Sequence, residues 1–209
     1  MVKNIVLFLL LPTSLFSQTY ESWNTINVSG KLSKNTTLLV EGEQRYNFTE
    51  SRVRYFHYDI GYCVKLNQKN KLGLYVRDIY EMKKNYRIHE FRPHLDYFYE
   101  SGNWKIRTRA EYQIKEIYGN NWRFRIRPLY QSDLFRNINP YFSTEFNFTE
   151  KGITRNRTNI GLTIKSGDIE IQPGYLIESN GAYSLRNFKH LSNWSYRNSL
   201  WINFKVKLT

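Results

Sequence analysis

The feature that most constrains the fold is the alternation of apolar and polar residues along nearly the whole chain. Between residues 121 and 131, aromatic, aliphatic and proline residues at even positions alternate with Arg123, Arg125 and Arg127. A helix would spread three arginines at this spacing around its circumference, whereas a β-strand places them on one face. The same period of two recurs in residues 36–45, 56–65, 104–115, 140–148 and 200–208. The sequence therefore predicts an all-β chain.

Turn-forming Gly, Asn and Ser residues separate the alternating stretches and delimit eleven runs without a domain linker. These runs are residues 20–29, 36–47, 52–66, 71–81, 86–100, 104–117, 121–134, 139–149, 154–166, 168–178 and 196–208. Most span about 10 to 14 residues, whereas strands of globular proteins average about 5 to 6. A tilted strand that crosses a bilayer needs about 9 to 11 residues. The run lengths favour a single antiparallel transmembrane β-barrel.

The number of barrel strands does not follow from the eleven runs alone. Bacterial single-chain barrels have an even number of strands. Either one of the eleven runs is not a full strand, or residues 183–195 contain another. We expect twelve strands, with ten as the alternative. Because the sequence does not settle whether the strand count is even or odd, it does not show which set of turns faces outward.

Aromatic residues make up 17% of the chain and gather toward the ends of the runs. A transmembrane barrel carries such aromatic girdles at both membrane interfaces. The expected girdle residues are Trp23, Tyr46, Tyr80, Tyr99, Trp104, Tyr118, Trp122, Tyr130 and Trp201. Alternation alone also allows the opposite orientation. A soluble calycin-like barrel would turn the apolar face inward around a ligand and the arginine face outward to water.

The N-terminus has the order of a secretory signal peptide, predicted to span residues 1–17. Lys3 supplies the basic region, Ile5 to Leu11 form the apolar stretch, and Ser14 and Ser17 are small residues suited to cleavage. Residues 18–209 would then form the exported barrel domain. The single cysteine, Cys63, excludes an intramolecular disulfide framework. Together these features predict localisation in the outer membrane of a Gram-negative bacterium.

The chain carries 31 Lys and Arg against 18 Asp and Glu, a net charge of +13. Such an excess would ordinarily suggest a nucleic-acid partner, but export argues against one. Much of the charge falls on alternate strand positions and is expected to line the lumen. The predicted charge network comprises Glu41, Glu43, Arg45, Arg77, Glu90, Arg92, Arg107, Arg109, Glu111, Arg123, Arg125, Arg127, Glu145, Arg155 and Arg157. Two interpretations stay open: a salt-bridged plug, or a narrow arginine-lined pore that favours anions.

A family resemblance rests on short motifs along the mature chain. The motifs are the predicted signal followed by Trp23, then Lys31-Leu32-Ser33-Lys34, Glu41-x-Glu43-x-Arg45, Glu90-x-Arg92 and Arg107-x-Arg109-x-Glu111. In these respects the chain resembles the Gram-negative envelope family known as domain of unknown function 2490. The resemblance implies an outer-membrane β-barrel with a charged lumen, and it implies no established activity.

Catalytic signatures are weak, and we expect no enzymatic activity, no cofactor and no metal. The sequence has no Gly-x-Ser-x-Gly motif and no metal-spaced His/Cys cluster. The alternative of an outer-membrane enzyme acting on lipid or peptide rests on His57 beside Asp59 and on His94 beside Asp96. The expected partners are outer-membrane lipid and the barrel-assembly machinery, with lipopolysaccharide or small anionic solutes as further candidates. The role expected is structural or permeability-related.

Overall fold

The computed structural model describes residues 19–117, 119–132, 134–135, 137–184, 189–190 and 194–208. The predicted signal peptide, residues 1–17, lies outside the described residues. Among the residues described, no helix is long and apolar enough to cross a membrane. The strands are β1 (Thr19–Lys31), β2 (Thr36–Asn47), β3 (Arg52–Lys65), β4 (Asn70–Met82), β5 (Arg87–Ser101), β6 (Trp104–Lys115), β7 (Asn121–Gln131), β8 (Ile138–Thr149), β9 (Gly152–Ser166), β10 (Ile169–Ser184), β11 (Lys189–His190) and β12 (Ser195–Leu208).

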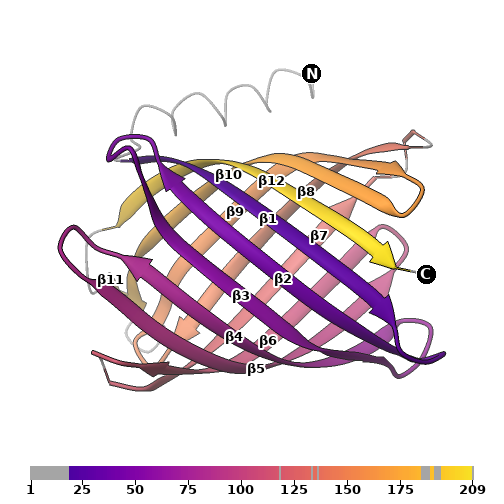
Figure 1. Cartoon of the computed structure of the whole chain (residues 1–209), viewed down its shortest axis with the longest axis horizontal. Coiled ribbons are helices and arrows are strands. Elements are labelled where there is room, and N and C mark those ends of the chain that lie inside the picture. Colours follow the sequence, from indigo (N-terminus) through magenta and orange to yellow (C-terminus); the bar gives the residue numbers. More distant parts are fainter. Residues whose placement is uncertain are drawn as a thin grey trace.

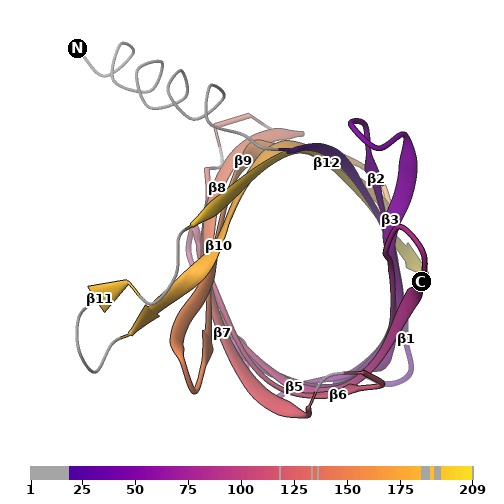
Figure 2. The same ribbon diagram turned by 90° about the vertical axis from the view of Figure 1, so that its left-hand side faces the viewer.

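The strands form one sheet that closes into a barrel (Figure 1). From β1 to β10 each strand pairs antiparallel with the next, and β10 continues to β12. The ring closes between β12 and β1, which run parallel, with Trp23 opposite Trp201 and Val28 opposite Val206. Viewed along its axis, the wall encloses an open oval (Figure 2). Because the closing strands are parallel, β1 begins at one rim, here called the N-terminal rim, and β12 ends at the other, the C-terminal rim.

The expectation of twelve or ten barrel strands is corrected by this closure. Within the described residues, eleven strands form the ring, and they correspond to the eleven runs read from the sequence. The two-residue strand β11 falls in the stretch expected to hold a twelfth barrel strand. Among the described residues it pairs only with Tyr183 and Ser184 of β10. An even number is required only where the first and last strands pair antiparallel. The parallel β1–β12 seam removes that requirement.

Two of the tightest turns lie at the C-terminal rim and depend on glycine. Gly102, between β5 and β6, and Gly167, between β9 and β10, have φ angles of 55° and 57°. Residues with a side chain rarely adopt this left-handed conformation, which two-residue hairpin turns require. These glycines therefore allow β5 to continue directly into β6, and β9 into β10.

The charged face of the sheet points inward and the apolar face outward. Glu111, Asp96 and Glu178 are at most 1% exposed, whereas Tyr58 and Leu74 on the outer wall are 61% and 63% exposed. Alternation left the direction open, and the structure places arginine and carboxylate side chains in the interior. A small set of apolar side chains is also buried, namely Trp23, Tyr75, Ile79, Ile88, Tyr141 and Leu176.

The residues predicted for an aromatic girdle do not all face outward. Trp104, Trp122 and Tyr130 are exposed. Trp23 and Trp201 instead line the lumen, opposite each other across the seam. Their positions in the alternation share the face of the charged residues, which is why they turn inward. Tyr118 lies outside the described residues.

Candidate functional site: the charged lumen

The lumen contains a larger cavity of about 400 Å³ and a smaller one of about 110 Å³. The larger cavity extends toward the C-terminal rim, where Ser29, Lys105 and Lys207 line it. The smaller cavity lies toward the N-terminal rim, where Glu21 and Arg197 line it. Each cavity is therefore associated with one rim of the barrel.

A layer of four arginines separates the two cavities. Arg45, Arg77, Arg125 and Arg157 line both of them, and each projects from a different strand. Each is held by at least one buried or half-buried carboxylate. We call these four side chains and their carboxylate partners the central layer. The two cavities meet at this layer, and any path through the lumen would pass between its side chains.

The first part of the central layer spans β2, β3 and β4. Arg77 Nη2 donates to Asp59 Oδ2 at 2.5 Å and to Glu41 Oε1 at 3.1 Å. Glu41 Oε1 also lies 2.9 Å from His57 Nε2. One guanidinium thus joins carboxylates of two other strands, which fixes the side chains of three neighbouring strands relative to one another.

Further ion pairs beside the central layer lie on β5, β6 and β7. Arg109 makes a two-pronged contact with Asp96, with distances of 2.5 and 2.7 Å. Glu111 accepts a hydrogen bond from Arg123 and also pairs with Arg125 at 3.3 Å. Bidentate, charge-assisted contacts of this kind are stronger than hydrogen bonds between neutral groups. Most of these interior charges are therefore paired with an opposite charge on an adjacent strand.

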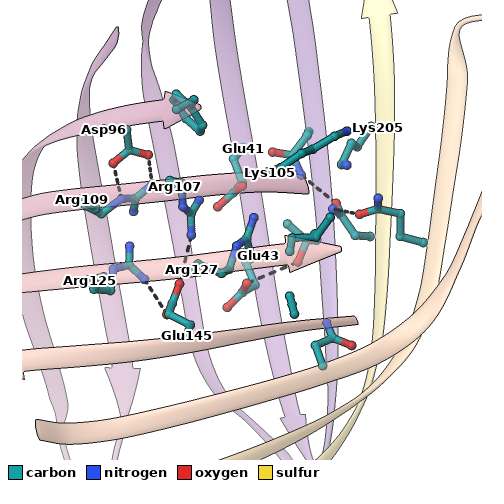
Figure 3. A pocket seen from close by; sticks show the side chains of 18 of the residues that line it. Glu41, Glu43, Asp96, Lys105, Arg107, Arg109, Arg125, Arg127, Glu145 and Lys205 are labelled. Carbon is teal, nitrogen blue, oxygen red and sulfur yellow. Dashed lines mark hydrogen bonds and ion pairs between the residues drawn. The ribbon is translucent and has the colours of Figure 1, made fainter. Parts of the chain in front are cut away.

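Glu145 on β8 is the meeting point of three arginines. Arg107 Nη2 lies 3.1 Å from its carboxylate, Arg125 Nη1 3.3 Å and Arg157 Nη1 3.4 Å. Figure 3 shows Arg107 and Arg125 reaching Glu145 from neighbouring strands. Arg125 and Arg157 are shared with Glu111 and Glu178, so Glu145 links the ion pairs of β6 and β7 to those of β9 and β10.

A second convergence lies on β10, where Glu178 is 1% exposed. Its carboxylate pairs with Arg157 at 2.6 Å, Arg197 at 3.1 Å and Arg155 at 3.7 Å. Glu178 and Arg197 are outside the network predicted from the sequence. Their alternate positions on β10 and β12 carried the same signal as the predicted residues, so the period of two could have identified them.

An aromatic sandwich completes the central layer. The guanidinium carbon of Arg45 lies 3.7 Å from the ring centre of Trp23 and 4.0 Å from that of Tyr55. The same guanidinium pairs with Glu43 at 2.6 Å, and Trp23 Nε1 donates to Glu21 at 2.9 Å. Stacking over aromatic faces favours a guanidinium over an ammonium group. Trp23 is therefore a lumen residue that holds Arg45 in place.

All the sequence-predicted network residues except Glu90 and Glu111 line one of the two cavities. Those two are buried beside them: Glu90 accepts two hydrogen bonds from Arg92, at 2.5 and 2.8 Å, and Glu111 pairs with Arg123. The carboxylates that hold these arginines lie on β2, β3, β5, β6, β8 and β10, so the network runs around the lumen.

The two histidines considered for catalysis lie in the lumen. His57 contacts Glu41 rather than Asp59, although His57 and Asp59 share a face of β3. His94 Nε2 is 3.6 Å from Asp59 and 4.0 Å from Asp96. Both carboxylates are already bonded to arginines, Asp59 to Arg77 and Asp96 to Arg109. The histidines are therefore packed into an ion-pair network.

The same region holds one group of residues with the ligand types of a metal site. Glu41, His57 and Asp59 offer three ligand atoms within 4.8 Å of one another. Arg77 donates to both carboxylates and occupies the space beside them. A cation placed there would have to compete with this guanidinium, so the residues present do not fit a metal.

A further histidine–carboxylate pair lies on the outer wall. His89 Nε2 is 2.5 Å from Asp78 Oδ1, and Tyr80 donates to Asp78 Oδ2 at 2.8 Å. The residues directly opposite Asp78 on the neighbouring strands are Tyr58 and Phe91. Neither supplies a serine or cysteine nucleophile. The cluster is a polar group in an otherwise aromatic surface.

The fold and the lumen define the chain as a single-chain β-barrel with an ion-paired interior. The sequence profile of a family described as "Protein of unknown function (DUF2490)" matches residues 20–200, and the chain belongs to this family. The resemblance found in the motifs is thereby confirmed. A search of the curated proteins finds no match.

Proposed function

We propose that this protein is an outer-membrane β-barrel of the Gram-negative envelope whose lumen is closed by its central layer. Its role is then structural, or concerned with controlled permeability, rather than that of an open pore. The observation that carries the proposal is the inside-out distribution of side chains: charges are buried in the lumen, and large apolar residues cover the outer wall. A bilayer solvates such a wall, whereas water does not.

The ring strands are 11 to 16 residues long, which is enough for a tilted crossing of the bilayer. The rival soluble calycin-like barrel needs its aromatic face inside to enclose a ligand. In this chain the aromatic residues Tyr58, Tyr62 and Phe124 are exposed on the outer wall. The orientation thus supports the membrane barrel over the soluble one. Outer-membrane lipid and the barrel-assembly machinery are the partners that this proposal requires.

Closure of the lumen rests on the ion pairs of the central layer. Arg77 and Arg125 are less than a tenth exposed, and they hold carboxylates from β2, β3, β6 and β8. Breaking a buried pair by removing one partner is costly because the other charge is left without compensation. The layer should therefore stay shut without a bound ligand.

Cell fractionation combined with gel mobility tests the location. We expect the protein in the outer-membrane fraction, with a mobility that shifts on boiling as a folded barrel melts. A protein found in the periplasm or the medium, with no mobility shift, would contradict the membrane barrel and favour the soluble alternative.

Planar-bilayer recording tests the closed lumen. The native protein should give no conductance steps at either polarity. The double variant Asp59→Ala/Arg77→Ala removes both partners of one pair, so it opens the layer without leaving either charge of that pair alone. It should give steps while keeping the heat-modifiable mobility of a folded barrel. Conductance steps from the native protein would contradict the closed lumen and favour the interpretation as an anion-favouring pore.

Catalysis is not part of the proposal, because His57 and His94 face carboxylates that arginines already engage. Lipid or peptide hydrolysis by the purified barrel, lost in His57→Ala or His94→Ala but not in His89→Ala, would overturn this part.

A further inference from the structure

Of the three arginines at Glu145, Arg125 and Arg157 each have a second carboxylate, whereas Arg107 pairs with Glu145 alone among the described residues. Arg107, Arg125 and Arg157 all contact Glu145. Arg127 lies directly opposite Arg107 on the neighbouring strand and lines the same larger cavity. Among the described residues, Arg127 has no carboxylate within ion-pair distance. Like charges placed directly opposite on adjacent strands are destabilising unless something lies between them.

Buried hydrogen-bond donors without a partner also lie beside the larger cavity. Within the described part of the chain, Arg125 Nε and Arg109 Nη1 are buried without a hydrogen-bond partner. Both arginines line the larger cavity and are at most 6% exposed. Buried donors are nearly always satisfied in native proteins, by the protein itself or by ordered water. Water or the acceptor oxygens of a ligand in the cavity would satisfy these two.

The excess continues toward the C-terminal rim. The larger cavity is lined by ten Arg and Lys side chains against six Asp and Glu, so its wall is positive overall. Lys105 and Lys207 lie at this end, and neither has an ion pair with a described residue. Lys205, by contrast, is held by Glu170 at 2.7 Å. Lys105 and Arg107 project from the same strand, β6, whereas Lys205 projects from β12 (Figure 3).

We propose that the larger cavity is a binding site for a small water-soluble phosphate ester. Arg107 and Arg127 would hold its phosphate, and Lys105 would meet it from the rim side. A phosphate places two negative charges and several acceptor oxygens at one point, which matches two guanidinium groups facing each other across one strand pair. The cavity volume of about 400 Å³ falls within the range of small-molecule sites. The ligand is larger than the phosphate group alone and is taken up inside the barrel, away from the lipid-facing wall.

The inference goes beyond the proposed function, and its test does not depend on membrane location or conductance. Purified native barrel in detergent would be titrated with glycerol 3-phosphate in chloride buffer of fixed ionic strength, followed by calorimetry. Glycerol serves as the uncharged control. Malate serves as the dicarboxylate control, because its two charges lie at separate ends. We expect saturable binding of glycerol 3-phosphate and much weaker binding of malate and glycerol.

Variants locate the site. Arg127→Gln removes a charge with no described ion pair, so the barrel should remain folded while affinity falls by about tenfold or more, the scale of a lost charge-assisted hydrogen bond. Arg127→Lys should recover part of the affinity, because lysine restores the positive charge but not the two-pronged hydrogen bonding of a guanidinium. Arg54→Gln, in the smaller cavity, is the control for charge alone and should bind like the native protein. Glu21, the partner of Arg54, keeps its ion pair with Arg197 in this variant.

Three results would overturn the proposal. The first is an absence of binding by the native protein. The second is an equal loss of affinity in Arg127→Gln and Arg54→Gln, which would show only general charge attraction. The third is malate binding as tight as that of glycerol 3-phosphate. Heat-modifiable mobility of each variant separates loss of the site from loss of the fold.

Discussion

The ring of Tyr75 covers Gly61, the residue directly opposite it on the neighbouring strand. A Cβ atom at Gly61 would lie 2.3 Å from the Tyr75 ring and 2.3 Å from the carbonyl oxygen of Leu74. The ring also covers Gly73 and stacks on His94, with ring centres 5.1 Å apart. Glycine lets this tyrosine lie along the wall, so that its ring lines the larger cavity instead of filling it.

Replacing Gly61 with alanine should therefore destabilise the barrel. The clash includes backbone, so rotation of Tyr75 cannot relieve it, and overpacking of this kind costs about 1 to 3 kcal/mol. The measurement is the urea midpoint of the heat-modifiable folded band. Gly42 is the matched control, because a Cβ there meets nothing within 4 Å and Gly42→Ala should leave the midpoint almost unchanged. Equal midpoints for the two variants would contradict the close approach of Tyr75.

Glu145→Gln should be among the most harmful single changes in the lumen. Arg107, Arg125 and Arg157 would lose the carboxylate on which they converge. Removing one partner of a buried ion pair costs about 3 to 5 kcal/mol. Glu50→Gln provides the comparison, because Glu50 pairs with Arg52 in an exposed turn, where a pair contributes about 1 kcal/mol or less. Similar unfolding midpoints for both variants would show that Glu145 does not hold the lumen together.

Arg45→Lys should weaken the barrel although it keeps the charge. The guanidinium lies between Trp23 and Tyr55, and an ammonium group cannot stack on both faces or form the fork to Glu43. A desolvated cation–π contact contributes about 2 kcal/mol, so the unfolding midpoint should fall by a measurable amount. Arg87→Lys is the control on the outer wall, where the guanidinium is 5.0 Å from the ring centre of Tyr80. A loss in Arg87→Lys as large as in Arg45→Lys would argue against the sandwich.

The parallel seam can be tested by crosslinking. In a Cys63→Ser background, cysteines at Val28 and Val206 would face each other across β1 and β12. Directly opposed residues on paired strands are close enough for a disulfide or a short crosslinker. We expect rapid oxidative crosslinking of this pair. Cysteines at Tyr20 and Val206 should stay uncrosslinked, since Tyr20 is opposite Asn198. The reverse result would favour an antiparallel seam.

The sequence was sufficient to predict each ring strand but not how the ring closes. Residues 121–131 show why: the period of two identifies a strand and its charged face, and the structure has β7 from Asn121 to Gln131. The period carries no information about which strand pairs with which, or in what direction. The parallel pairing of β1 with β12 depends on the geometry of the whole ring, which no local pattern encodes.

The lumen could be predicted to the same degree. Alternation indicated which residues share a face, including Glu145 and the arginines near it. It could not show that three arginines from three strands meet at Glu145, because that depends on strand order, stagger and side-chain reach. It also misassigned Trp23 to a membrane girdle, since tryptophan suits both an interface and a stacking partner for Arg45.

The parallel seam has a consequence for the sidedness of the chain. Thr19 and Leu208 lie at opposite rims, because β1 and β12 run in the same direction. In a membrane-inserted barrel, epitopes at the two ends of the barrel would report on different compartments, one outside the cell and one in the periplasm. Antibody access to one epitope on intact cells would therefore orient the whole molecule, and with it the rim through which the larger cavity opens.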